Sequence, residues 1–260
     1  MPSPASSRAF STATAPDDAP LRERPLVAWL LAGYALVWAW AAVRPLDRAE
    51  WWLEQLLPAG WLLFLALAWR KRLVRLSDAS CAATALFLAL HAVGARYGYE
   101  GAPAGRWLAD VLGTARNPYD RVVHAAFGLC LGYVARELWL GFGRFTRFAR
   151  AWASAHAWAG VLAASALYEI LEWTAALLVA PGLGSAFVGA QGDVWDAPAD
   201  MAMAAAGASV GLVLAELAHR ARAALRRPAR VYEATGPGTR HAARVGSMLK
   251  AQHPRQRTAV

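Results

Sequence analysis

Long apolar segments separated by short blocks of charge constrain this 260-residue chain more than any other feature of its sequence. The composition is 57% hydrophobic and 17% charged, and the charges gather between the apolar runs instead of lining one side of each helix. An apolar run of about 18 residues crosses the ~30 Å hydrocarbon layer of a bilayer as a helix. Segments of roughly this length are 26–43, 51–69, 79–95, 122–140, 151–180 and 201–217. The sequence therefore predicts an all-α fold, a polytopic membrane bundle of six transmembrane helices.

A soluble helical protein is the alternative fold, because alanine-rich helices in a large core can also be apolar on every side. The 13 tryptophans favour a membrane, since several lie at the ends of the predicted spans, where amphipathic rings prefer the headgroup region. These tryptophans are Trp51, Trp52, Trp69, Trp139 and Trp152. An aromatic residue at the end of a soluble helix is ordinary, so the tryptophans support the membrane fold without proving it.

The placement of lysine and arginine predicts the orientation of the bundle. With the amino end inside, the inner segments hold 21 of these residues and the outer segments hold 6. The positive-inside rule then places both termini in the cytoplasm. The net charge of +9 is accordingly interpreted as a topology signal and not as a nucleic-acid-binding surface. The partner that the sequence predicts is the lipid bilayer, with no nucleic acid.

The two ends of the chain differ in composition from the predicted membrane domain, residues 25–218. Residues 1–24 are rich in Ser, Ala and Pro and have no apolar core, which predicts a disordered cytoplasmic tail instead of a cleavable secretory signal. Residues 219–260 are basic and contain several Pro and Gly residues. They predict a second disordered cytoplasmic tail, lying against the anionic inner leaflet.

Ionisable residues inside or beside the apolar segments mark the candidate functional site, because a charge in hydrocarbon is costly. All of them fall in the outer half of the predicted topology: Asp120, His124, Glu169, Glu172, Asp193, Asp196 and Asp200. Asn117 and Pro118 predict the start of a helix, since Asn is a good N-cap and Pro is tolerated in the first turn. His124 then lies one turn beyond Asp120 on the same face.

Two further predicted helices carry acids in the same way. Glu169 and Glu172 are three residues apart, and Asp196 and Asp200 are four apart at a helix start near Pro198. Small residues follow the ionisable ones on two of the three helices and allow another helix to approach closely. They are Gly128 and Gly132 on one helix and Ala204, Gly207 and Gly211 on the other.

Several motifs, taken in order, resemble a known family. They are His91-Ala-Val-Gly94-Ala-Arg-Tyr97-Gly-Tyr99, Asn117-Pro-Tyr119-Asp120-Arg121-Val-Val-His124, Arg136-Glu137, Tyr168-Glu169-Ile-Leu-Glu172-Trp173 and Gly192-Asp193-Val-Trp195-Asp196-Ala-Pro-Ala-Asp200-Met201. Over roughly residues 25–218 the chain resembles the YjdF-type inner-membrane proteins of bacteria. The resemblance implies a multi-pass helical protein of the bacterial inner (plasma) membrane, and it supplies no reaction, because the activity of that family is unassigned. Pro118 stands where a histidine is common in similar proteins, which removes one candidate ligand.

A metal site is the first functional hypothesis. Carboxylates and histidine at these spacings on facing helices are how helical bundles build carboxylate metal centres, and such ligands suit Mg, Mn, Ca or Fe. The expected ligands are His124, Glu169, Glu172, Asp196 and Asp200. The residues expected to orient or hydrogen-bond those ligands are His91, Tyr119, Asp120, Tyr168 and Asp193. Such a centre would hydrolyse an ester or phosphodiester at the outer membrane surface.

Two other hypotheses stay open. Acids and histidines that face a bundle interior are typical of ion and proton pathways, although no inverted repeat is evident and the acids lie to one side of the midplane. Alternatively the charges are structural, with Asp120 paired with Arg121 or Arg116, and Glu137 paired with Arg136 or Arg144.

Overall fold

The computed structural model describes residues 23–71, 73–142, 150–179 and 190–225, and within them every regular element is a helix. Four stretches of the described chain are long and apolar enough to cross a membrane. They are α1 (Pro25–Ala42), the stretch Arg48–Arg70 that holds α2 (Arg48–Glu54) and α3 (Leu56–Arg70), α4 (Asp78–Tyr97) and α8 (Asp196–Leu225). The expected all-helical class is therefore confirmed. Two more helices, α6 (Tyr119–Phe142) and α7 (Arg150–Val179), are as long as these but are not among the four candidate spans.

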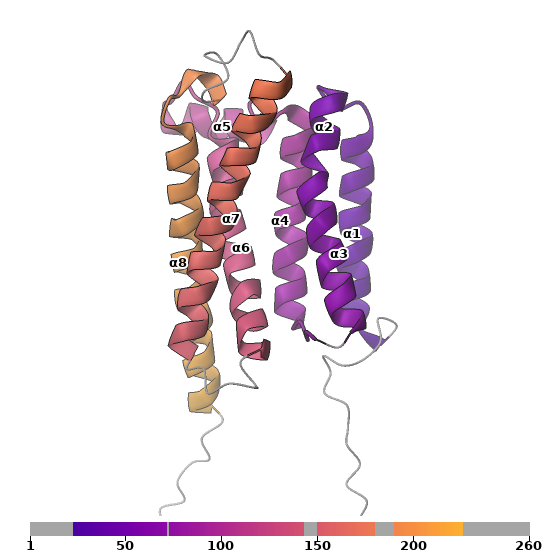
Figure 1. Cartoon of the computed structure of the whole chain (residues 1–260), viewed down its shortest axis with the longest axis vertical. Coiled ribbons are helices and arrows are strands. Elements are labelled where there is room, and N and C mark those ends of the chain that lie inside the picture. Colours follow the sequence, from indigo (N-terminus) through magenta and orange to yellow (C-terminus); the bar gives the residue numbers. More distant parts are fainter. Residues whose placement is uncertain (1–22, 72, 143–149, 180–189, 226–260) are drawn as a thin grey trace, which may run out of the picture. The chain divides into compact units, whose positions relative to one another are not determined.

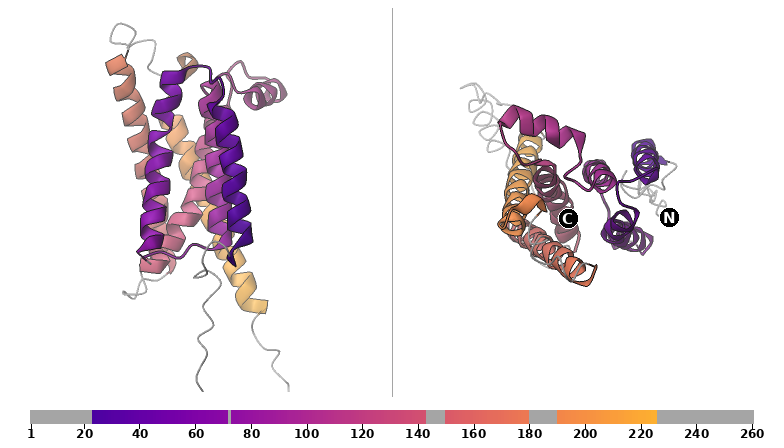
Figure 2. Two further views of the ribbon diagram at one scale, coloured as in Figure 1. Left: turned by 90° about the vertical axis from the view of Figure 1, so that its right-hand side faces the viewer. Right: turned by 90° about the horizontal axis from the view of Figure 1, so that it is seen from above.

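Successive long helices run in alternate directions (Figure 1). α1, α4 and α7 run toward the end of the bundle that holds α5 (Pro103–Leu112), whereas α2 with α3, α6 and α8 run away from it. α5 lies across this end instead of along the bundle (Figure 2). We call it the α5 end. Helix α5 was not predicted, since residues 96–121 were assigned to an outer segment. This short amphipathic helix buries only Gly105 and Ala109.

Local sequence explains where α4 and α5 begin and end. The side chain of Ser77 caps α4 and accepts the backbone N–H of Ser80. α4 and α5 each end at a glycine in the left-handed conformation, Gly98 (φ 57°) and Gly113 (φ 66°). Residues that carry a Cβ rarely adopt this conformation, so glycine at both positions lets the chain turn sharply across the α5 end.

Small residues hold α6 and α8 in close contact, as the sequence predicted. A Cβ added to Gly128 of α6 would overlap the carbonyl oxygen of Ala204, and one added to Gly207 of α8 would overlap that of Ala125. Ala204 itself is fully buried. Any side chain larger than hydrogen at these two glycines therefore requires the two helix backbones to separate.

Charged residues at the opposite end of the bundle have partners other than those expected. Glu137 was predicted to pair with Arg136 or Arg144. Instead its Oε1 accepts the backbone N–H of Ser77 at 2.9 Å, and Arg136 Nη2 donates to Glu216 Oε2 at 3.1 Å. The physical reason is that Glu137 faces the amino end of α4, whose first N–H groups have no partner within the helix. Arg144 lies outside the described residues.

The helices α1 to α7 and most of α8 belong to one compact unit, Met1–Leu217, and Ala218–Val260 form a second unit. Residues 1–22 and 226–260 hold most of the two predicted tails and lie outside the described residues. The domain boundaries and the disorder of both tails therefore stay predictions. α8 continues as a helix to Leu225.

Candidate functional site

Three of the predicted residues converge at the α5 end. Asp120 and His124 come from α6 and Asp200 from α8, and one potential ligand atom of each lies within 4.8 Å of the others. His124 Nε2 lies 3.6 Å from Asp120 Oδ1. His124 and Asp200 are buried, Asp200 with only 1% of its surface exposed.

The glycine contacts of α6 and α8 explain this convergence. His124 lies one turn before Gly128, and Asp200 lies one turn before Ala204, which is the residue that Gly128 contacts. Because both helices run in the same direction, the two side chains reach the same level. The close contact of Gly128 with Ala204 therefore places His124 beside Asp200.

Glu169 of α7 adds a third helix to the group. Its Oε1 lies 3.5 Å from His124 Nε2, and its side chain is 11% exposed. α7 packs directly against α6, which keeps Glu169 beside His124. We call Asp120, His124, Glu169 and Asp200 the carboxylate–histidine cluster.

Two carboxylate oxygens of this cluster are buried without a hydrogen-bond donor. They are Oε1 of Glu169 and Oδ1 of Asp200. A buried acceptor without a donor costs free energy, and a buried carboxylate without a counter-charge costs more. A bound cation, a proton or a ligand donor at this place would therefore stabilise the folded protein.

The other two predicted aspartates pair with arginines. Asp196 Oδ1 contacts the Arg116 guanidinium and lies 3.9 Å from Arg121 Nη2, and Asp193 Oδ2 lies 3.4 Å from Arg116 Nη1. The backbone N–H of Trp195 is the main cause that holds the pKa of Asp193 below its usual range, and Arg121 adds to it. The Asp196 carboxyl group also lies beside that of Asp200, and so it joins this ion-pair network to the cluster.

Asn117 fastens the start of α6 to its neighbours. Its Oδ1 accepts the N–H of Tyr119 at 3.0 Å, which confirms the predicted N-cap. Its Nδ2 donates to the carbonyl oxygens of Glu100 (2.7 Å) and Ala102 (3.0 Å), and its backbone N–H donates to Gln191 Oε1. One side chain thus fixes the end of α4, the start of α5 and the segment before α8 relative to the cluster.

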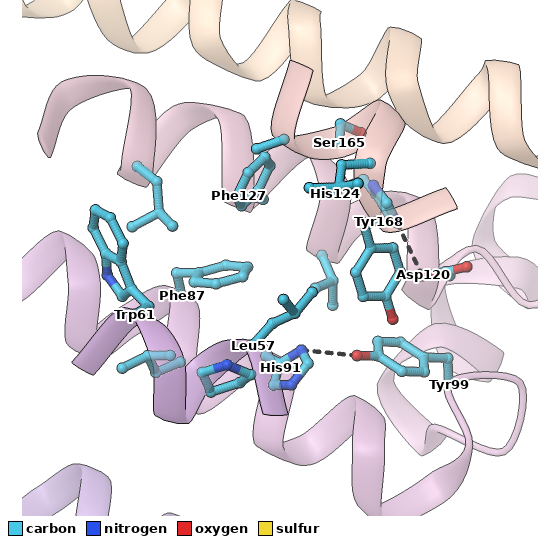
Figure 3. A pocket seen from close by; sticks show the side chains of 16 residues that line it. Leu57, Trp61, Phe87, His91, Tyr99, Asp120, His124, Phe127, Ser165 and Tyr168 are labelled. Carbon is cyan, nitrogen blue, oxygen red and sulfur yellow. Dashed lines mark hydrogen bonds and ion pairs between the residues drawn. The ribbon is translucent and has the colours of Figure 1, made fainter. Parts of the chain in front are cut away.

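A second polar group lies beside the first, and sequence reasoning missed its central residue, Glu54 (Figure 3 shows the neighbouring side chains). The hydroxyls of Tyr168 and Tyr99 donate to the Glu54 carboxylate, at 3.1 Å from Oε1 and 3.3 Å from Oε2. His91 Nδ1 lies 2.9 Å from the Tyr99 hydroxyl, and His91 Nε2 lies 3.8 Å from Glu54 Oε2. We call Glu54, His91, Tyr99 and Tyr168 the tyrosine–glutamate cluster.

The chain turns back on itself to bring Tyr99 into this cluster. Tyr99 has a positive φ of 51°, directly after Gly98, and its backbone N–H donates to the carbonyl oxygen of Gly94 at 2.9 Å. A Cβ on Gly94 would lie 2.7 Å from Tyr99 Cδ1. The absence of a side chain at Gly94 therefore makes room for the tyrosine ring, which explains the spacing of the His91–Tyr99 motif.

A cavity of about 210 Å³ adjoins both clusters (Figure 3). One side of its lining is apolar: Leu57, Pro58, Trp61, Phe87, Leu88, Phe127 and Leu131. The other side carries His91, Tyr99, Asp120, His124, Ser165 and Tyr168. The Tyr168 and His124 rings meet edge to face with centroids 5.7 Å apart, which connects the two clusters along the polar side.

A family model described as "Predicted membrane protein (DUF2238)" matches residues 26–221. The chain belongs to this family. It is 41% identical over 116 residues to the inner membrane protein YjdF of Escherichia coli (strain K12), a match that covers 45% of this chain and 54% of that relative. The chain thus spans about half the length of the curated relative it matches, and no solved structure matches it. The family and the apolar helices identify a membrane protein and name no reaction.

Two predicted site residues of this DUF2238 protein belong to neither cluster, although Glu172 is near enough to interact electrostatically with Asp120, Glu169 and Tyr168. Glu172 is exposed on α7, and within the described residues its side chain has no hydrogen bond or ion pair. The Tyr119 hydroxyl donates to the carbonyl oxygen of Leu90 at 2.9 Å and packs between α4 and α6. The sequence does contain a signal for Glu54, the residue that was missed. Glu54 is the single acid in the otherwise apolar segment 51–69.

Proposed function

We propose that this DUF2238 protein is an inner-membrane protein of six transmembrane helices, with both termini cytoplasmic and a divalent-cation-dependent hydrolase site at its outer end. The six spans are α1, α2 with α3, α4, α6, α7 and α8. The alternating helix directions and the printed name of the relative support this topology. The scarcity of Lys and Arg in the segments at the α5 end supports its outward orientation.

The observation that carries the proposal is the spacing of Asp120, His124 and Asp200, whose ligand atoms lie within 4.8 Å of one another. Ligands on opposite sides of a Ca²⁺ ion lie about 4.6–5.2 Å apart, twice the usual metal–oxygen distance. Atoms within this limit are close enough to share one divalent cation, Ca²⁺ or the smaller Mn²⁺, after small movements of the side chains. The oxygen-rich ligand set with one imidazole suits Mn, Ca, Mg or Fe.

Burial supports the cation as well. Asp200 Oδ1 and Glu169 Oε1 have no hydrogen-bond donor, although both atoms are inaccessible to solvent. The neighbouring Asp193 and Asp196 already pair with arginines, so the charge that remains to be compensated belongs to Asp120, Glu169 and Asp200. A divalent cation would neutralise two of these three carboxylates.

Hydrolysis is the reaction that this arrangement serves best. A divalent cation held by Asp120, His124 and Asp200 would supply Lewis-acid chemistry: it would make a bound water a stronger acid and would polarise the oxygen of an ester or phosphodiester. Glu169, 3.5 Å from His124, is placed to accept the proton of the attacking water and to return it to the departing alcohol. His91, Tyr99 and Tyr168 would orient the substrate through the tyrosine–glutamate cluster.

Proton- or ion-coupled transport is the alternative function, and the cavity lining argues against it. The polar side chains gather at the α5 end, whereas the lining toward the middle of the bundle consists of Trp61, Phe87, Phe127 and Leu131. A transport pathway needs polar groups or water on both sides of its binding site.

Cation binding tests the proposal directly. The purified protein, stripped with chelator and titrated with Mn²⁺, is expected to bind the ion in an electron paramagnetic resonance assay. Asp200→Asn should weaken binding about 10–100-fold or more. Asp110→Asn is the matched control, because Asp110 is an exposed acid of α5 at the same end. Equal Mn²⁺ binding by all three proteins, or none by the wild type, would contradict the proposal.

A further inference from the structure

We infer that the cavity beside the two clusters receives the hydrocarbon chain of a membrane lipid, which enters between α3 and α7. As a statement about the substrate of the hydrolytic site, the inference rests on the proposed function. As a statement about lipid binding, it stands on the cavity itself. The ligand class is a glycerolipid with an ester-linked acyl chain.

The shape and lining of the cavity fit one end of such a chain. The volume of about 210 Å³ is larger than that of an engineered apolar cavity of about 150 Å³ that stays dry and binds benzene, so several methylene groups fit in it. Trp61, Phe87 and Phe127 form the apolar side opposite Asp120 and Tyr99 (Figure 3). An apolar wall of this kind stays dry and favours hydrocarbon.

The mouth of the cavity opens where the protein meets lipid. Leu57 of α3 and Leu167 of α7 line the cavity, yet 48% and 54% of their surfaces are exposed. Both belong to helices whose outer surfaces are apolar, with Leu63 on α3 and Ile170 on α7 exposed beside them. A ligand therefore reaches this mouth from the bilayer.

The polar side of the cavity supplies an independent sign of a ligand. The hydroxyl of Ser165 is buried, with 1% of the residue exposed, and its Oγ has no hydrogen-bond partner. It lines the cavity together with Asp120 and His124. Because a buried hydroxyl without a partner is costly, an ester oxygen that reaches this point would satisfy it. The same ester would then lie next to the carboxylate–histidine cluster.

Photocrosslinking tests the inference with the full chain in lipid nanodiscs that contain a phosphatidylethanolamine with a diazirine near the end of one acyl chain. After irradiation, peptide mass spectrometry is expected to find label concentrated at residues 57–61, 87–88 and 164–168. Ala164→Trp should reduce this labelling about tenfold, because the new ring fills part of the cavity. Ala163→Trp is the matched control, since Ala163 is exposed but does not line the cavity.

A second variant guards against misfolding of the first. Ser165→Leu adds volume at the neighbouring lining residue of α7 and should reduce the label at residues 57–61 in the same way. The inference is overturned if the label is spread evenly over exposed apolar residues of α1, α3 and α8. It is also overturned if Ala164→Trp and Ser165→Leu label like the wild type.

Titration of Mn²⁺ on the same preparations separates this inference from the proposed hydrolase. Concentrated label without Mn²⁺ binding supports the lipid site and contradicts the metal-dependent reaction. Mn²⁺ binding with evenly spread label supports the metal site and contradicts the lipid site. Concentrated label that Ala164→Trp removes while Mn²⁺ affinity stays unchanged supports both.

Discussion

The hydroxyl of Tyr168 donates to the Glu54 carboxylate, 3.1 Å from Oε1, across 114 residues of sequence. The same tyrosine ring contacts His124 edge to face. Tyr168 thus joins the first half of the chain to the second and the tyrosine–glutamate cluster to the carboxylate–histidine cluster. Its position makes it a support for both clusters at once.

Removing that hydroxyl should destabilise the protein while the ring stays in place. Tyr168→Phe leaves the Glu54 carboxylate with one donor fewer, and we expect a loss of about 1–3 kcal/mol in the free energy of unfolding. Thermal unfolding in detergent measures the change. Tyr133→Phe, a tyrosine of α6 that does not line the cavity, is the control and should unfold like the wild type. An unchanged Tyr168→Phe would show that the contact with Glu54 contributes nothing to stability.

The close contact of α6 and α8 predicts that Gly207 tolerates no side chain. Gly207→Leu forces the backbone away from Ala125 and should cost at least about 1–3 kcal/mol of stability. It should also weaken Mn²⁺ binding, because the same contact sets Asp200 beside His124. Gly33→Ala in α1 is the control: nothing lies within 4 Å of a Cβ there, and replacing a helical glycine gains about 0.5–1 kcal/mol. If Gly207→Leu and Gly33→Ala shift the unfolding temperature equally, the close contact at Gly207 does not explain the loss of stability.

The two glutamates of α7 should differ in their effect on cation binding. Glu169→Gln removes a buried carboxylate next to His124 and is expected to weaken Mn²⁺ binding about 10–100-fold. Glu172→Gln changes an exposed side chain and should leave the affinity within about twofold. Mn²⁺ titration of both variants decides between them. The reverse order would assign to Glu172 alone the ligand role that the sequence predicted for both glutamates.

Asp193 predicts an acid-dependent loss of stability. The Trp195 N–H and the arginines keep its folded-state pKa below that of the unfolded chain, so its stabilising effect is complete above the unfolded value of about 3.9. That effect disappears as the pH falls through the lower, folded-state pKa. The difference in unfolding temperature between wild type and Asp193→Asn should therefore be largest near neutral pH and shrink below about pH 4. A difference that stays constant from pH 7 to pH 3 would contradict this assignment.

The proposed orientation can be tested from outside the cell. In a background with Cys81 and Cys130 replaced by alanine, Ala104→Cys on α5 should react with a membrane-impermeant maleimide in intact cells with a permeabilised outer membrane. Leu73→Cys, exposed at the opposite end, should react only after lysis. The opposite pattern would place the α5 end in the cytoplasm.

The sequence by itself determined the all-helical class, the membrane and the residues that share a helix face, and it missed helix α5. These properties depend on apolar length and on the 3.6-residue period, both of which are local. The same local chemistry predicted that Asn117 caps α6 and that small residues line α6 and α8, and the structure confirms both. The family match, to a predicted membrane protein, agrees with the membrane fold expected from the sequence.

Only the tertiary structure decided which of these residues meet. It brought in Glu54 through Tyr168 of α7 and Tyr99 of the turn after α4, paired Asp196 with Arg116 and left the Glu172 side chain exposed. The reason is that rotation of a helix about its axis and its height beside a neighbour are set by packing, here by the contact of Gly128 with Ala204. A displacement of one turn, about 5.4 Å, would separate Asp200 from His124 and remove the cluster, although every helix would keep the same sequence pattern.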